Sequence, residues 1–170
     1  MNGKSLWQEV SPYETENALK LIGKDWMLIT APDQNGVNAM TASWGCMGVL
    51  WNKPVAVCFI RPQRYTFGLV ENVERISLCF MNEQYREALA ICGRKSGRDC
   101  DKLALAGLSA EYEDGVPMIS ESKMVLICKK LYADDIKESA FVDSSLLVNY
   151  TAGDYHRMYI LEIQKVLMKK

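Results

Sequence analysis

The sequence predicts a β-rich fold, a β-barrel with inserted helices. Short runs of apolar and β-branched residues outnumber the helical patterns, and turn signals separate them, as is typical of barrels. Hydrophobic residues make up 49% of the 170 residues and charged residues 24%, as in ordinary globular proteins. The chain has no internal repeat, low-complexity tract or linker, so we expect residues 1–170 to form a single domain.

The first strands are predicted to form a hairpin. Trp26–Thr30 is a short apolar strand, the turn residues Asp33–Gly36 follow, and Asn38–Trp44 resumes an extended pattern. The Asn-Gly pair of the turn readily supplies the positive φ that tight turns demand. Pro54–Ile60 is apolar and β-branched, which predicts a buried strand.

Helices and strands alternate in the middle of the chain. Thr66–Val73 carries apolar residues at helical spacing, and Arg75–Met81 returns to a strand pattern. Glu83–Cys92 places its apolar residues on one helical stripe. Asp99 is expected to cap a further helix that contains Leu103.

Two long strands, Met124–Tyr132 and Tyr155–Leu167, are predicted near the end of the chain. Side chains of a strand alternate between its two faces, so every second residue of the last strand should face the same way. The residues expected on that shared face are Tyr159, Leu161, Ile163 and Leu167.

The balance of charges excludes several classes of partner. With 20 basic and 21 acidic residues the net charge is −1, so no overall positive field attracts nucleic acid or an acidic membrane surface. The first residues lack the apolar core of a signal peptide, and no apolar run approaches the ~18–20 residues that span a bilayer. We therefore expect a soluble, cytoplasmic protein.

Cysteine and histidine usage argues against metal and triad chemistry. The six cysteines form no CxxC pair, and most have apolar neighbours, so they should pack as small buried hydrophobes. His156 is the only histidine, which disfavours zinc and a Ser-His-Asp or Cys-His mechanism. His156 is expected to be structural, and its functional alternative is a donor to a bound anionic ring or substrate.

Two basic loops are the first candidate site. Arg61–Thr66 follows the buried strand, and Cys92–Lys102 follows a predicted helix. Arginine binds phosphate bidentately, and loop amides and hydroxyls can complete the shell. The alternative is that both loops are solvated charged turns. The cations involved are Arg61, Arg64, Arg94, Lys95, Arg98 and Lys102.

The strand Asn38–Trp44 is the second candidate. Its small residues Thr41, Ala42 and Ser43 would let a flat ring approach the backbone, whose amides can bond the ring's heteroatoms, and Trp44 could cover an apolar face. The alternative is an ordinary edge strand with a core tryptophan.

The order of these segments resembles the flavin reductase-like, FMN-binding split-barrel family, and especially its flavoredoxin-like branch. The resemblance extends roughly from Ile29 to Val166. It is carried by the strand Asn38–Trp44 (NAMTASW), by Pro54–Val57 and Ile60–Thr66 (IRPQRYT), by Cys92–Lys102 (CGRKSGRDCDK), and by the shorter matches Ala106–Leu108, Pro117–Glu121 and Gly153–His156.

The resemblance implies a split barrel that forms a homodimer, with FMN at or near the subunit interface. The residues it places beside the flavin ring are Asn38, Met40, Thr41, Ala42, Ser43 and Trp44. Those it places near the ribityl phosphate are Arg61, Gln63, Arg64, Tyr65, Thr66, Ser96, Arg98 and Lys102.

The sequence departs from the family pattern in three places. Gln63 stands where a small hydroxyl residue is common, which could remove one phosphate hydrogen bond. Leu161 replaces a glycine often found before the acidic residue of the last strand, here Glu162. The segment Asp134–Tyr150 fits no pattern of the family.

The function implied is electron transfer from NADH or NADPH through FMN to free flavin or a protein acceptor, because the cofactor does the chemistry and the protein binds and orients it. No GxGxxG motif follows a strand, so the nicotinamide donor would bind only transiently over the flavin. The alternatives are a non-catalytic FMN-binding electron carrier or flavin-storage protein, and a barrel for another ligand such as haem.

Overall fold

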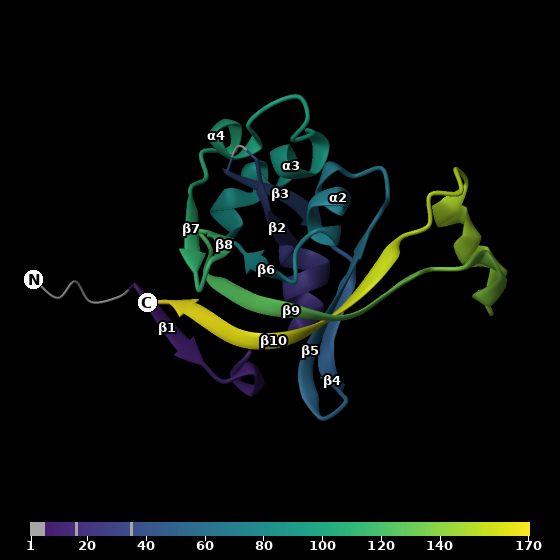
Figure 1. Cartoon of the computed structure of the whole chain (residues 1–170), viewed down its shortest axis with the longest axis horizontal. Coiled ribbons are helices and arrows are strands. Elements are labelled where there is room, and N and C mark those ends of the chain that lie inside the picture. Colours follow the sequence, from purple (N-terminus) through teal and green to yellow (C-terminus); the bar gives the residue numbers. More distant parts are fainter. Residues whose placement is uncertain (1–5, 16, 35) are drawn as a thin grey trace, which may run out of the picture.

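The computed structural model describes residues 6–15, 17–34 and 36–170. An antiparallel sheet of eight strands forms its centre, in the order β3-β2-β6-β9-β10-β5-β4, with β1 paired to the end of β10 (Figure 1). The strands of this sheet are β1 Trp7–Val10, β2 Met27–Asp33, β3 Gly36–Ala42, β4 Gly45–Leu50, β5 Lys53–Ile60, β6 Arg75–Phe80, β9 Met124–Asp135 and β10 Arg157–Lys169. The β-rich prediction is confirmed.

Short helices and a small hairpin surround the sheet (Figure 1). The helices are α1 Ala18–Lys20, which continues into the π-helix η2 Leu21–Asp25, and α2 Tyr65–Glu71, α3 Arg86–Arg94 and α4 Lys102–Ala106. The 3₁₀ turns are η1 Pro12–Glu14, η3 Glu83–Tyr85, η4 Glu138–Ala140 and η5 Ser144–Tyr150, and the hairpin pairs β7 Ala110–Glu113 with β8 Val116–Ile119. No helix in this part of the chain is long and apolar enough to cross a membrane.

The central strands are buried on both faces. On β9, Leu126 packs into the core beneath α2, while Val125 and Ile127 pack under α3 and the β7–β8 hairpin. This alternation is the period-two pattern of a strand covered from both sides. Four of the six cysteines share these cores, and all six are free thiols, as predicted: Cys58, Cys79, Cys92 and Cys128 are buried, Cys100 is half-buried and Cys46 is exposed.

The face predicted for the last strand is wrong at its end. Register shifts interrupt the β9–β10 ladder after Ile160 and after Ile163. An extra residue at such a bulge reverses which side chains point to which face. Val166 therefore joins the core of Tyr159, and Leu167 lies on the opposite face.

Other predicted boundaries also move. β3 ends at Ala42, so Ser43 and Trp44 form the link to β4, a strand whose two glycines hid it from a pattern search. The cap of α4 is Asp101, whose carboxylate accepts from the Ala104 amide at 3.0 Å, and not Asp99. The β2–β3 hairpin is confirmed, but Asn35 of its turn lies outside the described residues.

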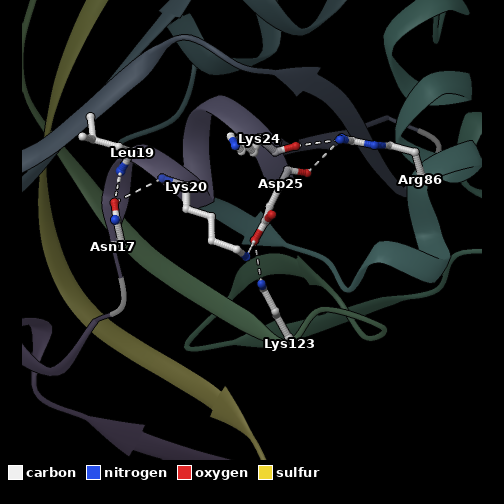
Figure 2. A network of polar contacts seen from close by, with 7 residues as sticks. All are labelled: Asn17, Leu19, Lys20, Lys24, Asp25, Arg86 and Lys123. Atoms are coloured by element: carbon white, nitrogen blue, oxygen red, sulfur yellow. Dashed lines mark hydrogen bonds and ion pairs between the residues drawn. The ribbon is translucent and has the colours of Figure 1, made fainter.

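Asp25 fastens the helix before β2 to the rest of the fold (Figure 2). Its carboxylate pairs with Lys20 at 2.7 Å and with Lys123, just before β9, at 2.9 Å. Burial opposes ionisation, but the hydrogen bonds from these two lysines hold the pKa of Asp25 below its usual value. From α3, Arg86 donates to the Lys24 carbonyl at 2.7 Å and lies 3.9 Å over the Trp26 ring. The helix is therefore fixed beside the start of β4.

Residues 136–156 form an arm between β9 and β10 that projects from the sheet (Figure 1, right). The Ile136 amide donates to the His156 carbonyl at 2.9 Å and closes its base. The arm contains most of the segment that matched no family pattern.

Candidate functional site

The two basic loops predicted from sequence lie against each other. Arg98 donates to the Gln63 carbonyl at 3.3 Å, and Arg64 donates to the Gly93 carbonyl at 2.9 Å. The loop between β5 and α2 is thereby joined to the loop between α3 and α4.

β3 connects to the same place through Asn38. Its side-chain amide donates to the Thr66 hydroxyl at 2.7 Å, and both residues are buried. Tyr65 donates its hydroxyl to Asp33 at 2.8 Å, and the Arg98 guanidinium lies 5.2 Å from the Tyr65 ring centre. Ser96 contributes a hydroxyl that accepts from the Arg98 amide at 3.2 Å.

Gly97 is packed so closely that a side chain cannot fit. A methyl carbon there would lie 2.7 Å from the Tyr65 ring and closer still to the Asn38 amide oxygen. We expect Gly97→Ala to lower the free energy of unfolding by about 1–3 kcal/mol, because the loop must move away from β3. Gly48→Ala on β4, where nothing lies within 4 Å, is the control and should cause no loss. Urea unfolding of both variants tests this, and equal stability of the two would contradict the packing.

Lys102 and Arg64 are cations without an ionic partner among the described residues. Lys102 is only 4% exposed, and its ammonium donates to the Cys92 carbonyl at 3.3 Å. Among the residues that the structure describes, neither Lys102 nor Arg64 forms an ion pair. Burial lowers the pKa of both groups, and Arg64 further lowers the pKa of Lys102. A buried positive charge is unfavourable unless an anion accompanies it, so this pair is a suitable anion site.

Two hollows are lined by residues of β3 and of the link that follows it. The first, of about 580 Å³, lies beside Asn38, Gly97 and Lys102. The second, of about 230 Å³, is lined by every residue from Met40 to Trp44. Its other lining residues are Phe59, Arg61, Arg64 and His156. We call this second hollow the ring pocket.

Arg61 and Gln63 face the arm, away from the cation pair. Both donate to the Asp154 carboxylate, Gln63 at 2.7 Å, and these hydrogen bonds lower the pKa of Asp154. Arg61 also donates to the Asn149 carbonyl at 2.9 Å. The structure thus gathers Arg64, Tyr65, Thr66, Ser96, Arg98 and Lys102 at the loop contact, whereas Arg61 and Gln63 fasten the base of the arm.

His156 is buried beside the ring pocket. Its Nδ1 lies 2.9 Å from the Tyr150 hydroxyl, and its ring centre lies 5.1 Å from that of Trp44. Burial, assisted by Arg61, lowers the pKa of His156 to about 4, so the ring is neutral at pH 7.

A histidine with a depressed pKa makes folding sensitive to acid. His156 binds a proton more tightly in the unfolded chain than in the folded one. Its contribution to the free energy of unfolding is therefore fully present above pH 6.5 and is lost as the pH drops toward 4. We expect His156→Gln to remove about 2 kcal/mol of the stability loss between pH 7 and pH 4.5. Urea unfolding at both pH values measures this, and an unchanged pH dependence in the variant would show that His156 is not responsible.

The sequence interpretation missed several residues of the site. Phe59 alternates with the core residues of β5 and therefore faces the ring pocket, a position that period two could have indicated. Tyr150 lies in the segment that fits no family pattern, and Asp154 lies in the matched stretch Gly153–His156 without having been assigned a role. The packing of Gly97 depends on Asn38 and Tyr65, which come from distant segments.

Comparisons with known proteins agree on one architecture. The family model described as a flavin reductase like domain matches residues 20–170. The FMN-binding protein from Thermus thermophilus, solved with bound p-hydroxybenzaldehyde, is 20% identical with a TM-score of 0.68, over 85% of this chain and 71% of that one.

Two further solved structures are similar. The FMN-binding domain of a flavin reductases-like enzyme from Shewanella baltica OS155 is 17% identical with a TM-score of 0.70, over 96% of this chain and 77% of that one. Flavoredoxin of Desulfovibrio vulgaris (Miyazaki F) is 20% identical with a TM-score of 0.67, over 85% and 69%. No curated protein sequence matches the chain. These likenesses show the fold, a split barrel.

Proposed function

Because this chain belongs to the family of flavin reductase-like domains, we propose that it is an FMN-dependent oxidoreductase. It takes electrons from NADH or NADPH and passes them to an acceptor outside the ring pocket. FMN supplies the redox chemistry, and the protein supplies binding, orientation and electrostatics.

The observation that carries this proposal is a pair of cations, the buried Lys102 and the half-buried Arg64. Neither forms an ion pair in the described chain; Lys102 lines the hollow beside Asn38, and Arg64 lines the ring pocket. FMN is an elongated molecule with a phosphate dianion at one end and a flat ring at the other. From Asn38 to the end of β3 at Ala42 the strand rises by roughly 13 Å, and Ser43 and Trp44 follow. The spacing suits a ligand whose charged and flat ends are apart.

The proposal assigns distinct roles along β3. Lys102, Arg64, Arg98, Ser96 and Thr66 hold the phosphate, and the strand from Met40 to Ser43 lies along the ring. Small side chains there leave the backbone amides accessible to the ring's heteroatoms. Trp44 and Phe59 bound the ring pocket and exclude water.

His156 would act as a neutral donor. If the Tyr150 hydroxyl donates to Nδ1, the imidazole proton stays on Nε2. Its low pKa keeps the ring uncharged at pH 7. His156 then positions a polar atom of the bound ring without adding a second charge.

A homodimer is part of the proposal. β4 is an end strand of the sheet, and its last residues Val49 and Leu50 are exposed at 61% and 37%, as is Trp51 in the turn that follows at 56%. An apolar edge strand of this kind is a favourable surface for pairing with a second copy. We expect Val49→Lys to convert the dimer to a monomer in sedimentation, and an unchanged sedimentation coefficient would exclude this edge as the interface.

The cytoplasm is the compartment we propose. NADH and NADPH are available there, and a chain with six free thiols suits a reducing environment.

The test is anaerobic addition of NADH or NADPH to the protein as isolated, with and without added FMN. The proposal predicts a flavin spectrum whose visible band bleaches with the donor. A flavin band that neither donor bleaches would favour an electron carrier or flavin store. A protein that does not take up FMN would exclude all three flavin roles.

A further inference from the structure

The arm encloses a second pocket, distinct from the ring pocket. Its volume is about 660 Å³, within the range of sites for small molecules. Most of its wall is apolar and comes from the arm itself and the strands that support it. The apolar lining residues are Trp44, Ile136, Ala140, Phe141, Val142, Leu146, Tyr150 and Met158. We call this hollow the arm pocket.

The walls of the arm pocket are held in place by the barrel. Tyr150 stacks on Tyr155 with ring centres 4.8 Å apart, and Phe141 meets the Tyr150 ring edge-on at 5.9 Å. Arg61 joins the arm to β5 through Asp154 and the Asn149 carbonyl. A cavity formed by stacked and anchored rings is available before a ligand arrives, which reduces the entropy lost on binding.

The charge of the arm is opposite to that of the phosphate loops. The arm together with Asp134 and Asp135, the last residues of β9, contains five carboxylates and a single lysine, with His156 neutral. Three carboxylates line the arm pocket: Asp134, Asp135 and Asp143. Lys137 pairs with Asp134 and Arg157 pairs with Asp135, but Asp143 makes its described bonds only to Ser145. Anionic molecules are therefore repelled from this pocket.

Trp44 borders both pockets. Tyr150 of the arm pocket also lies 2.9 Å from His156 of the ring pocket. The two pockets are therefore neighbours with shared walls, and molecules bound in them would lie close to each other.

We propose that the arm pocket binds the electron acceptor, and that this acceptor is a flat, apolar molecule without negative charge, of the quinone class. The proposal rests on the proposed function, because reduced FMN is the electron donor. NAD(P)H gives up a hydride and a proton is taken from solvent. The quinone gains two electrons and two protons, its two carbonyls become hydroxyls, and oxidised FMN is regenerated. Free FMN, a phosphate dianion, is a poor acceptor at this site.

Binding is tested first without any reductant, on the protein as isolated. Equilibrium dialysis compares anthraquinone-2-sulfonamide, which is neutral, with anthraquinone-2-sulfonate, which has the same ring and a negative charge. We expect the neutral quinone to bind about tenfold more tightly. Equal binding of the two probes, or no binding of the neutral one, overturns the proposal.

Two matched pairs of variants locate the site. Ala140→Trp fills the arm pocket and should weaken binding of the sulfonamide by about tenfold or more, whereas Val148→Trp places the same indole on the arm outside the pocket lining and should change nothing. Asp143→Asn should narrow the preference for the neutral probe, while Glu138→Gln, which removes the same charge outside the lining, should preserve it. Equal effects within either pair place the quinone elsewhere.

A second measurement separates this proposal from the function it rests on. Ala140→Trp should still bind FMN and bleach with NAD(P)H, but its KM for quinone should rise. An unchanged KM for quinone in that variant would contradict the proposed acceptor site without contradicting the proposed flavin function. Failure of FMN uptake in the unmodified protein removes the flavin function, and dialysis still decides whether the arm pocket takes a neutral quinone.

Discussion

Replacing Arg64 by glutamine and Lys102 by methionine together should weaken FMN binding by roughly 1,000-fold and leave riboflavin binding nearly unchanged. Each cation contributes charge-assisted hydrogen bonds to a phosphate that riboflavin lacks. Such a bond is worth about 1.5–3 kcal/mol, and every 1.4 kcal/mol is about tenfold in affinity. Titration with both ligands, followed by the change in flavin fluorescence, measures the two dissociation constants.

Arg94→Gln is the control for charge alone. Arg94 ends α3 next to the same loop, but it pairs with Glu87 and both side chains are exposed. Its loss should change FMN affinity by less than about threefold. If the double variant loses FMN and riboflavin equally, the two cations do not contact the phosphate.

Replacing Ser43 by phenylalanine should abolish flavin binding within the measurable range while the protein remains folded. Ser43 directly follows the small-residue strand β3 and lines the ring pocket, whose volume is about 230 Å³. A phenyl group there occupies the space needed by the flat ring, and overpacking of this kind costs about 1–3 kcal/mol even when the neighbours adjust. Both FMN and riboflavin should be lost, in contrast to the loss of phosphate contacts.

Cys46→Phe is the matched control, because Cys46 lies in the neighbouring hollow beside Leu19 and Ile22 but does not line the ring pocket. It should bind both flavins as the unmodified protein does. An unchanged titration of Ser43→Phe would remove this strand from the flavin site.

The pattern of apolar and β-branched residues predicted most of the strands, because the burial of a strand determines which residue types it contains. Pro54–Ile60 is apolar and β-branched, and β5 accordingly places Ala56, Cys58 and Ile60 in the core, while Val57 and Phe59 on its other face are half-buried. β4 was not predicted, because this exposed edge strand contains two glycines and places no apolar stripe in the core. The prediction of the face on which Leu167 lies was wrong because it depends on a bulge. The bulge arises from the pairing of β10 with β9, and the sequence of β10 alone does not show it.

Most residues of the candidate site were predictable from the sequence. How they divide between the contact of the two basic loops and the base of the arm was not. Arg64 joins the two loops through its hydrogen bond to the Gly93 carbonyl, and Thr66 joins them to β3 by accepting from Asn38. Arg61 and Gln63 belong to the same motif, but both donate to Asp154 at the base of the arm. Asp154 is 91 residues from Gln63 in the sequence, and only the folded chain brings these partners together.

Under the proposed function, the buried ammonium of Lys102 also links the lifetime of the protein to riboflavin supply. An empty site leaves two desolvated cations side by side, which weakens the fold, whereas a bound phosphate ester stabilises the native state by mass action. Chains made when riboflavin is scarce should therefore open more often and be cleaved sooner by cellular proteases. Abundance of the protein would then follow the flavin pool without any change in transcription.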